Sequence, residues 1–263
     1  MVIVAIHSYL GVHVIAREVI FVDLSLAQVA ALGSTVAIFL GADPDSARAF
    51  AYALGFTTIG AAMFALTRSK HGAGRVPQEA IIGIVYVVAS AAALLVADKS
   101  PRGGEAIKDI LVGSLLWVGW PAIGRLAAVY LVVGVFHWIL RRRFLTISFD
   151  PEAAEQAGWK LRLWDFWFYL SFGIVITFSV PIVGVLLVFS FLVVPAAIAF
   201  QFTRRHGFLA VISWIAGVLA SAIGITISFH YDLPTGPVVV CVFGLGLLLA
   251  WAVRRAFFRT VTA

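Results

Sequence analysis

Charged residues are scarce in this chain. Only 12% of its 263 residues are Asp, Glu, Lys or Arg, whereas 62% are hydrophobic. A soluble domain usually has about 25% charged and about 45–50% apolar residues, so this chain has too little polar surface to fold in water. A spanning helix needs about 20 apolar residues, and the composition provides for roughly eight or nine such helices. We therefore expect an all-α, polytopic transmembrane bundle that forms a single domain over residues 1–263.

Cysteine is nearly absent as well. Cys241 is the one cysteine, and it lies in an apolar run, which excludes a disulfide framework and a Cys-rich metal site. The net charge of +6 does not indicate nucleic acid, because the basic residues are spread over the short gaps between apolar runs. The first apolar run, residues 1–16, lacks the basic start and the small-residue cleavage site of a signal peptide.

The motifs of several enzyme classes are missing. The chain has no Gly-x-x-x-x-Gly-Lys-Ser/Thr loop for nucleotide phosphates, so any use of ATP is expected in a partner. Ser114 has no His or Lys base at a recognisable spacing, which argues against an intramembrane hydrolase. No predicted span contains a His-x-x-x-His or carboxylate-x-x-x-His pair, so a metal site preformed within one helix is not expected. We expect no cofactor on this chain.

Long apolar runs account for most of the sequence. The run over residues 110–140 is too long for one helix and is interrupted by Gly119 and Pro121, which predicts a short or re-entrant helix followed by a full one. The other runs predict one helix each, at residues 1–16, 25–41, 49–67, 79–97, 166–182, 183–202, 208–229 and 237–253.

The basic residues predict the orientation of these helices. If the gaps that carry most of them face the cytoplasm, 14 of the 19 Lys and Arg residues lie inside, as the positive-inside rule requires, and the C-terminus is cytoplasmic. The 14 residues are Arg17; Arg68, Lys70 and Arg75; Arg141, Arg142, Arg143, Lys160 and Arg162; Arg204 and Arg205; and Arg254, Arg255 and Arg259.

The longest polar stretch covers residues 141–165, and we call it the 141–165 segment. Within it Asp150 can cap a helix that has Pro151 in its first turn, Glu152 and Glu155 add negative charge near that start, and Gly158 supplies a stop. These residues predict a short, exposed helix. Such a helix is either an ordinary connection or a docking surface for a cytoplasmic partner.

Ionisable groups at membrane depth are costly, so each is a functional candidate. Glu79 and His137 also lie close enough to predicted helix ends to reach the interface, and Arg125 needs a partner such as Asp109. The predicted external turn over residues 230–237 combines an imidazole and a carboxylate, and either receives a cation or ends a helix. The candidates are Glu79, Asp109, Arg125 and His137, with His7 and His13 near the start and His230 and Asp232 in the turn.

The order of these segments resembles the membrane subunit of ABC importers for divalent metals such as zinc and manganese, the ABC-3 permease family. The resemblance covers nearly the whole chain. It is carried by Leu10–Arg17 with Phe21–Gly33, by Gln78–Ile84, by Ile110–Leu116, by Phe149–Gly158, and by Val183–Leu187 with Val194–Ala199 and the closing Asp232–Gly236.

The resemblance implies the permease subunit of an importer for zinc, manganese or iron in a bacterial plasma membrane. Such a permease is all-helical, pairs with a second copy in the lipid, binds a cytoplasmic ABC ATPase on each copy, and receives cargo from an extracytoplasmic solute-binding protein. It also implies that the ATPase contacts Asp150, Glu152, Glu155 and Gly158.

The second helix departs from the family pattern. The family motif Asp-Ala-Leu-Ser-His-Ala places a carboxylate and an imidazole at positions i and i+4, where this chain has Leu24 and Gln28. Leucine is not a ligand and a glutamine oxygen is a weak, neutral donor, so zinc cannot be held by the same bonds. Asp23 and Ser25 lie beside Leu24, but their side chains point about 100° away on a helix.

The sequence therefore does not identify the residues that bind the metal. The cargo is either a divalent metal ion or of another kind, such as a different ion or a metal complex. An ATP-independent secondary transporter is a further alternative, against which the lack of a clear inverted repeat weighs. The first helix starts later than the family pattern, so we expect a longer natural N-terminus. We expect the substrate pathway to include Gln28, Asp23, His13, Glu79, His230 and Asp232.

Overall fold

The structure is a computed structural model that describes residues 2–44, 46–68, 76–99 and 118–257. Every regular element in these ranges is a helix, as expected for an all-α chain. Asp109 and the Ile110–Leu116 stretch lie outside the described residues, so the predicted short helix before Gly119 is not tested.

The helices follow the predicted apolar runs closely. Eight of them are long and apolar enough to cross a membrane, and α1 is shorter, as the sequence indicates. In chain order they are α1 (Val2–Ala16), α2 (Val22–Phe39), α3 (Ala47–Leu66), α4 (Gln78–Asp98), α6 (Trp120–Ile139), α7 (Arg141–Phe149), α8 (Pro151–Gln156), α9 (Leu161–Val183), α10 (Val185–Phe202), α11 (His206–Tyr231) and α12 (Thr235–Phe257).

Local sequence explains where several helices begin and end. Ser46 caps α3 by accepting a hydrogen bond from the Ala49 amide at 3.2 Å. Gly119 precedes α6, and Pro121 occupies its first turn, where the missing N–H is not needed. Gly184 separates α9 from α10 with φ of +80°, a conformation that glycine adopts without strain.

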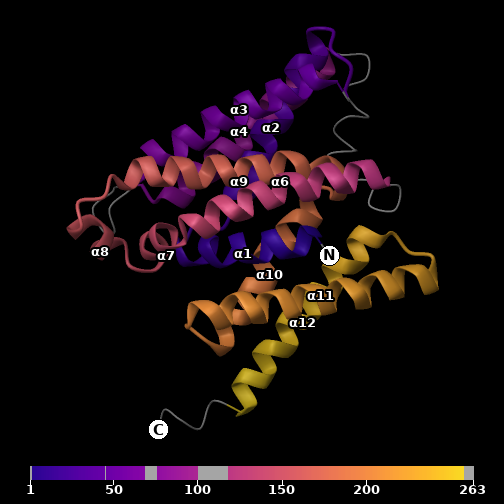
Figure 1. Cartoon of the computed structure of the whole chain (residues 1–263). Coiled ribbons are helices and arrows are strands. Elements are labelled where there is room, and N and C mark those ends of the chain that lie inside the picture. Colours follow the sequence, from indigo (N-terminus) through magenta and orange to yellow (C-terminus); the bar gives the residue numbers. More distant parts are fainter. Residues whose placement is uncertain (1, 45, 69–75, 100–117, 258–263) are drawn as a thin grey trace.

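The long helices pack in two groups (Figure 1). The first group consists of α2, α3, α4 and α9, in which α2 packs on α3 and α4 and α3 packs on α9. The second group consists of α1, α10, α11 and α12, in which α10 contacts all three of the others. Contacts between the groups are less extensive, and α6 touches both α9 and α1.

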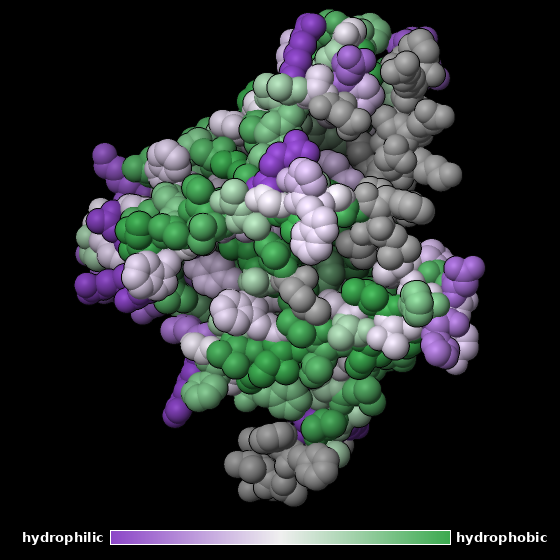
Figure 2. Space-filling model, turned by 45° about the vertical axis from the view of Figure 1, so that its right-hand side comes forward, coloured by the Kyte–Doolittle hydropathy of each residue, from purple (hydrophilic) through white to green (hydrophobic). Residues whose placement is uncertain are grey.

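The outer surface of the bundle is apolar. Figure 2 shows hydrophobic residues over the middle of the visible face and hydrophilic residues toward its edges. Large side chains such as Leu95, Leu131 and Val132 are 68–71% exposed, which suits contact with lipid. The end that carries α7, α8 and the α10–α11 turn bears most of the basic residues (Figure 1). The positive-inside rule predicts that this end faces the cytoplasm, and we call it the cytoplasmic end.

Candidate functional site

The 141–165 segment contains the helix that the sequence predicts. Asp150 Oδ1 accepts a hydrogen bond from the Ala153 amide at 3.0 Å, and Pro151 opens the six-residue α8. Gly158 follows with φ of +73°, so it ends the helix as expected. Asp150, Glu152, Glu155 and Gly158 are all exposed at the cytoplasmic end.

A second helix, α7, precedes α8 in this segment and was not predicted. It starts at Arg141, and Leu140 before it provides no side-chain cap, so no start signal marks the helix in the sequence. A pocket of about 450 Å³ opens between the α6–α7 junction and the chain that follows α8. It is lined by Ile139, Leu140, Arg142, Arg143, Ala157 and Trp159, and thus combines apolar walls with positive charge.

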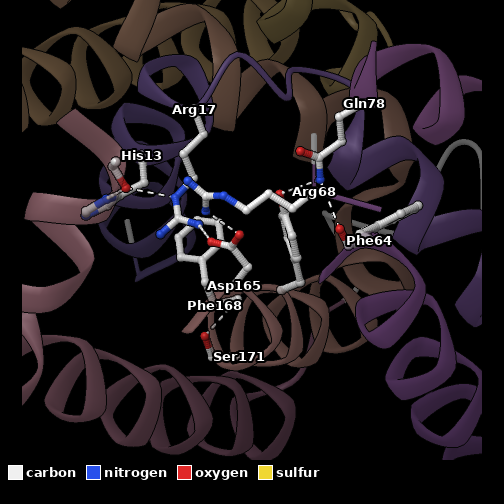
Figure 3. A network of polar contacts seen from close by, with 10 residues as sticks. His13, Arg17, Phe64, Arg68, Gln78, Asp165, Phe168 and Ser171 are labelled. Carbon is white, nitrogen blue, oxygen red and sulfur yellow. Dashed lines mark hydrogen bonds and ion pairs between the residues drawn. The ribbon is translucent and has the colours of Figure 1, made fainter. Parts of the chain in front are cut away.

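A buried ion network lies beside this segment (Figure 3). Asp165, in the first turns of α9, accepts a hydrogen bond from Arg17 Nη1 to its Oδ1 at 2.6 Å and one from Arg68 Nη1 to its Oδ2. The Arg17 and Asp165 side chains are 6% and 2% exposed. The Arg17 guanidinium also lies over the Phe168 ring, 3.9 Å from its centroid.

His13 joins this network through Ser148 near the end of α7. Ser148 Oγ accepts a hydrogen bond from Arg17 Nε at 2.8 Å and shares one with His13 Nδ1 at 2.9 Å. His13 is fully buried, and its ring also contacts the ring of Tyr9. The structure therefore places this predicted pathway residue against the 141–165 segment.

Asp23 and Glu79 lie together at the starts of α2 and α4. Asp23 is 2% exposed, and its Oδ1 is buried without a hydrogen-bond partner among the described residues. Glu79 Oε1 accepts a hydrogen bond from the Phe21 amide at 2.9 Å. The Glu79 and Asp23 carboxylates carry like charges and repel each other. The sequence did not predict this pair, because the two residues are 56 positions apart. Leu24 and Gln28 are half-buried farther along α2.

His230 and Asp232 lie at the opposite end of the molecule. Both are exposed, and Asp232 ends α11 in a left-handed conformation with φ of +51°. The 26 residues of α11 separate this turn from the cytoplasmic end by roughly 39 Å at 1.5 Å per residue. The six predicted pathway residues therefore do not form one site. Among the described residues no group of three or more His, Cys, Asp or Glu side chains is arranged to hold a metal ion.

The remaining ionisable candidates have other surroundings. His137 is buried in α6, where its Nε2 shares a 2.8 Å hydrogen bond with Ser171 Oγ. Arg125 is exposed on the same helix. The sequence did not single out Asp165, and it marked Arg17 and Arg68 only as basic residues of cytoplasmic gaps. Their one signal in the sequence is that each stands within a few residues of a long apolar run.

Comparison with known proteins gives several relatives. The chain is 30% identical over 209 residues to the chelated iron transport system membrane protein YfeC of Yersinia pestis, which covers 76% of this chain and 70% of that protein. It is 25% identical over 179 residues to a "Probable metal transport system membrane protein" of Chlamydia muridarum, covering 68% of this chain. The chain spans only 61% of the length of that relative.

The fold is shared with a solved structure, PsaBC from Streptococcus pneumoniae in complex with a Fab. The TM-score is 0.78 at 20% identity, over 95% of this chain and 87% of that one. Together with the eight membrane-length helices, these bacterial relatives show a multi-pass protein of the bacterial inner membrane. The model of the ABC 3 transport family matches residues 1–254, and the chain belongs to that family.

Proposed function

We propose that this chain is the permease subunit of an ABC importer for a divalent metal ion. The observation that carries the proposal is the exposed, capped α8 beside a concave pocket at the cytoplasmic end of a chain of this family. A protruding helix next to a cavity offers an ATPase a surface on which to dock. Because the sequence has no nucleotide-binding loop, the energy of ATP must reach the chain through such a contact.

The complete importer would contain further subunits. We propose a second copy of the permease in the lipid, one cytoplasmic ABC ATPase on each copy, and an extracytoplasmic solute-binding protein. The chain would alternate between outward and inward openings, with the cargo bound where its ligands converge in one state and released where they separate in the other. It would carry out no covalent chemistry itself.

The donors near α2 suggest which metal is carried. Gln28, Asp23 and Glu79 offer oxygen atoms, and carboxylate and carbonyl oxygens suit manganese better than the softer metals. We propose that these three residues line the inner part of the route, that His230 and Asp232 stand at its outer entrance, and that His13 lies at the inner end. Leu24 in place of a carboxylate also suits a bulkier cargo such as a metal complex.

Metal accumulation in cells tests this function. A strain without other importers for the metal would express the chain with its ATPase and binding protein, and uptake of Mn²⁺, Fe²⁺ and Zn²⁺ would be measured. We expect uptake of at least one of these ions, and a roughly tenfold higher half-saturating concentration for Gln28→Ala. Thr226→Ala is the control, because its exposed hydroxyl donates to the Ala222 carbonyl of the same helix. Absence of uptake of all three ions would contradict the proposal.

A further inference from the structure

Arg17 follows α1 of the second helix group and contacts two residues of the 141–165 segment. It follows the last residue of α1, and its guanidinium contacts Ser148 of α7 and Asp165 of α9 at once, at 2.8 and 2.6 Å. These two partners lie 17 positions apart, on either side of α8. One side chain therefore holds both ends of the part of the chain that carries the exposed helix.

Asp165 extends the connection into the first helix group. It belongs to α9, and its second oxygen accepts from Arg68, which follows the end of α3. The Arg17–Asp165 pair is therefore an ionic bond between the two groups at their cytoplasmic end. Both side chains are almost fully buried, so water screens the attraction between the two charges weakly.

Movement of Arg17 is passed on to α10. At Gly11 an added Cβ would lie 1.8 Å from the Leu192 carbonyl oxygen, so the backbones of α1 and α10 are in direct contact. A shift at the end of α1 must therefore carry α10 with it. In turn α10 packs on α11 and α12, so α1 moves as part of the whole second group.

The network also has an excess of positive charge. Two guanidinium groups share one carboxylate, and Arg17 Nη2 is buried without a hydrogen-bond partner among the described residues. If Arg17 withdraws, Asp165 keeps the counter-charge of Arg68, whereas Arg17 loses its carboxylate partner. The contact can therefore open without leaving the Asp165 carboxylate unpaired.

We propose that Arg17, Ser148 and Asp165 form a latch that holds the two helix groups together at the cytoplasmic end and releases them when the 141–165 segment is displaced. Arg17 is then a positioning residue that converts movement of α8 into movement of α1 and α10. This inference rests on the proposed function for its role in transport, but the latch itself is a property of the chain alone.

Spin labels on the purified chain test the latch directly. In a Cys241→Ser background, one label is placed at Ile20→Cys, just after Arg17, and one at Gln156→Cys on α8; both positions are exposed. Double electron–electron resonance then gives the distance distribution between them. We expect a narrow distribution with the latch intact and a broader one in Ser148→Ala and in Arg17→Lys, whose compact ammonium cannot contact Ser148 and Asp165 together.

A matched serine controls for the loss of a buried hydroxyl. Ser179→Ala removes a buried side-chain hydrogen bond of a serine, to Tyr130, and Ser179 lies 14 positions beyond Asp165 along α9. We expect this control variant to give the same label-to-label distance distribution as the parent. Ser148→Thr keeps a hydroxyl at this position, and we expect it to give the narrow distribution. Equal widths in the parent, Ser148→Ala and Arg17→Lys would overturn the latch.

Transport by the full complex gives the second measurement. With the ATPase and binding protein present, Ser148→Ala should lower the metal moved per ATP hydrolysed by roughly tenfold while ATP hydrolysis continues. An unchanged ratio would overturn the coupling role. If the parent complex moves no metal, the proposed function fails, and the label distances still decide whether the latch exists.

Discussion

At the scale of single residues, Gly11 sets the distance between α1 and α10. A Cβ at this position would lie 1.8 Å from the Leu192 carbonyl oxygen and 3.3 Å from the Cβ of Ala196. The first of these neighbours is backbone, which cannot rotate away as the end of a side chain can. Any larger residue must therefore push the two helices apart and loosen the contact through which α1 carries α10.

We predict that Gly11→Ala lowers the free energy of unfolding by about 1–3 kcal/mol, the usual range for an overpacked interior. Thermal unfolding of the purified chain in detergent measures the change. Gly83→Ala is the matched control, because its added Cβ meets no atom of the described residues within 4 Å beyond its own stretch of helix, and alanine favours a helix more than glycine does. Equal midpoints for the parent and Gly11→Ala would show that α1 and α10 are not held at this distance.

The sequence identifies individual costly residues better than it identifies their partners. His13 and Asp23 stand out as ionisable groups in apolar surroundings, and the structure buries both. Arg17 and Asp165 each occupy a polar gap, where charge is unremarkable, and 148 positions separate them. The fold brings the end of α1 and the start of α9 together, and no local pattern in the sequence encodes that meeting.

At the scale of elements, α8 depends on its surroundings. A helix of six residues is too short to be stable by itself in water. It is held by the Asp150 cap, by Pro151 in its first turn, and by Ala154, which is fully buried beneath it. Its outward face, with Glu152 and Glu155, is thus presented in one orientation, as a docking surface requires.

We predict that Glu152→Lys with Glu155→Lys weakens binding of the ATPase by about tenfold. Two positive side chains would then face an ATPase surface whose positive charge complements the two carboxylates. Co-purification of the two subunits and ATP-driven uptake measure the loss. The control is Asp43→Lys with Asp98→Lys, which makes the same change in charge at two exposed positions of the outer end. If both double variants retain the ATPase equally, α8 has no docking role.

Element boundaries show what hydropathy can and cannot predict. Every described long helix overlaps an expected apolar run, because a span needs a continuous apolar stretch whatever its neighbours are. Pro121 and Gly119 correctly indicate a new start at α6. By contrast, α7 begins with three arginines and has no cap, so composition and cap signals both leave it unmarked.

At the scale of the whole molecule, the chain combines an apolar exterior with a charged junction between two helix groups. The exterior fixes the bundle in lipid, since its exposed surface is dominated by side chains such as Leu95 and Val132. The junction lies at the cytoplasmic end, next to α8 and the pocket of about 450 Å³. A force that a partner applies to α8 therefore acts next to the junction between the two helix groups.

The sequence does not predict which helices of the bundle pack against one another. Apolar periodicity shows that a helix is buried in lipid or protein but does not show which helix it meets. The contact of α1 with α10 depends on the small residue Gly11, and the contact of α2 with α4 includes the hydrogen bond that Glu79 accepts from the Phe21 amide. The family resemblance implied a helical permease, and the grouping of its helices required the structure.

Metal uptake into vesicles is the most direct measurement of the central claim, that soluble ATPases drive transport through this chain. The chain would be reconstituted with its ATPase and binding protein, and entry of Mn²⁺, Fe²⁺ or Zn²⁺ would be followed with ATP, with a non-hydrolysable analogue, and without nucleotide. We predict that the metal accumulates with ATP alone. Uptake at the same rate without nucleotide, or by the chain without its ATPase, would contradict the account.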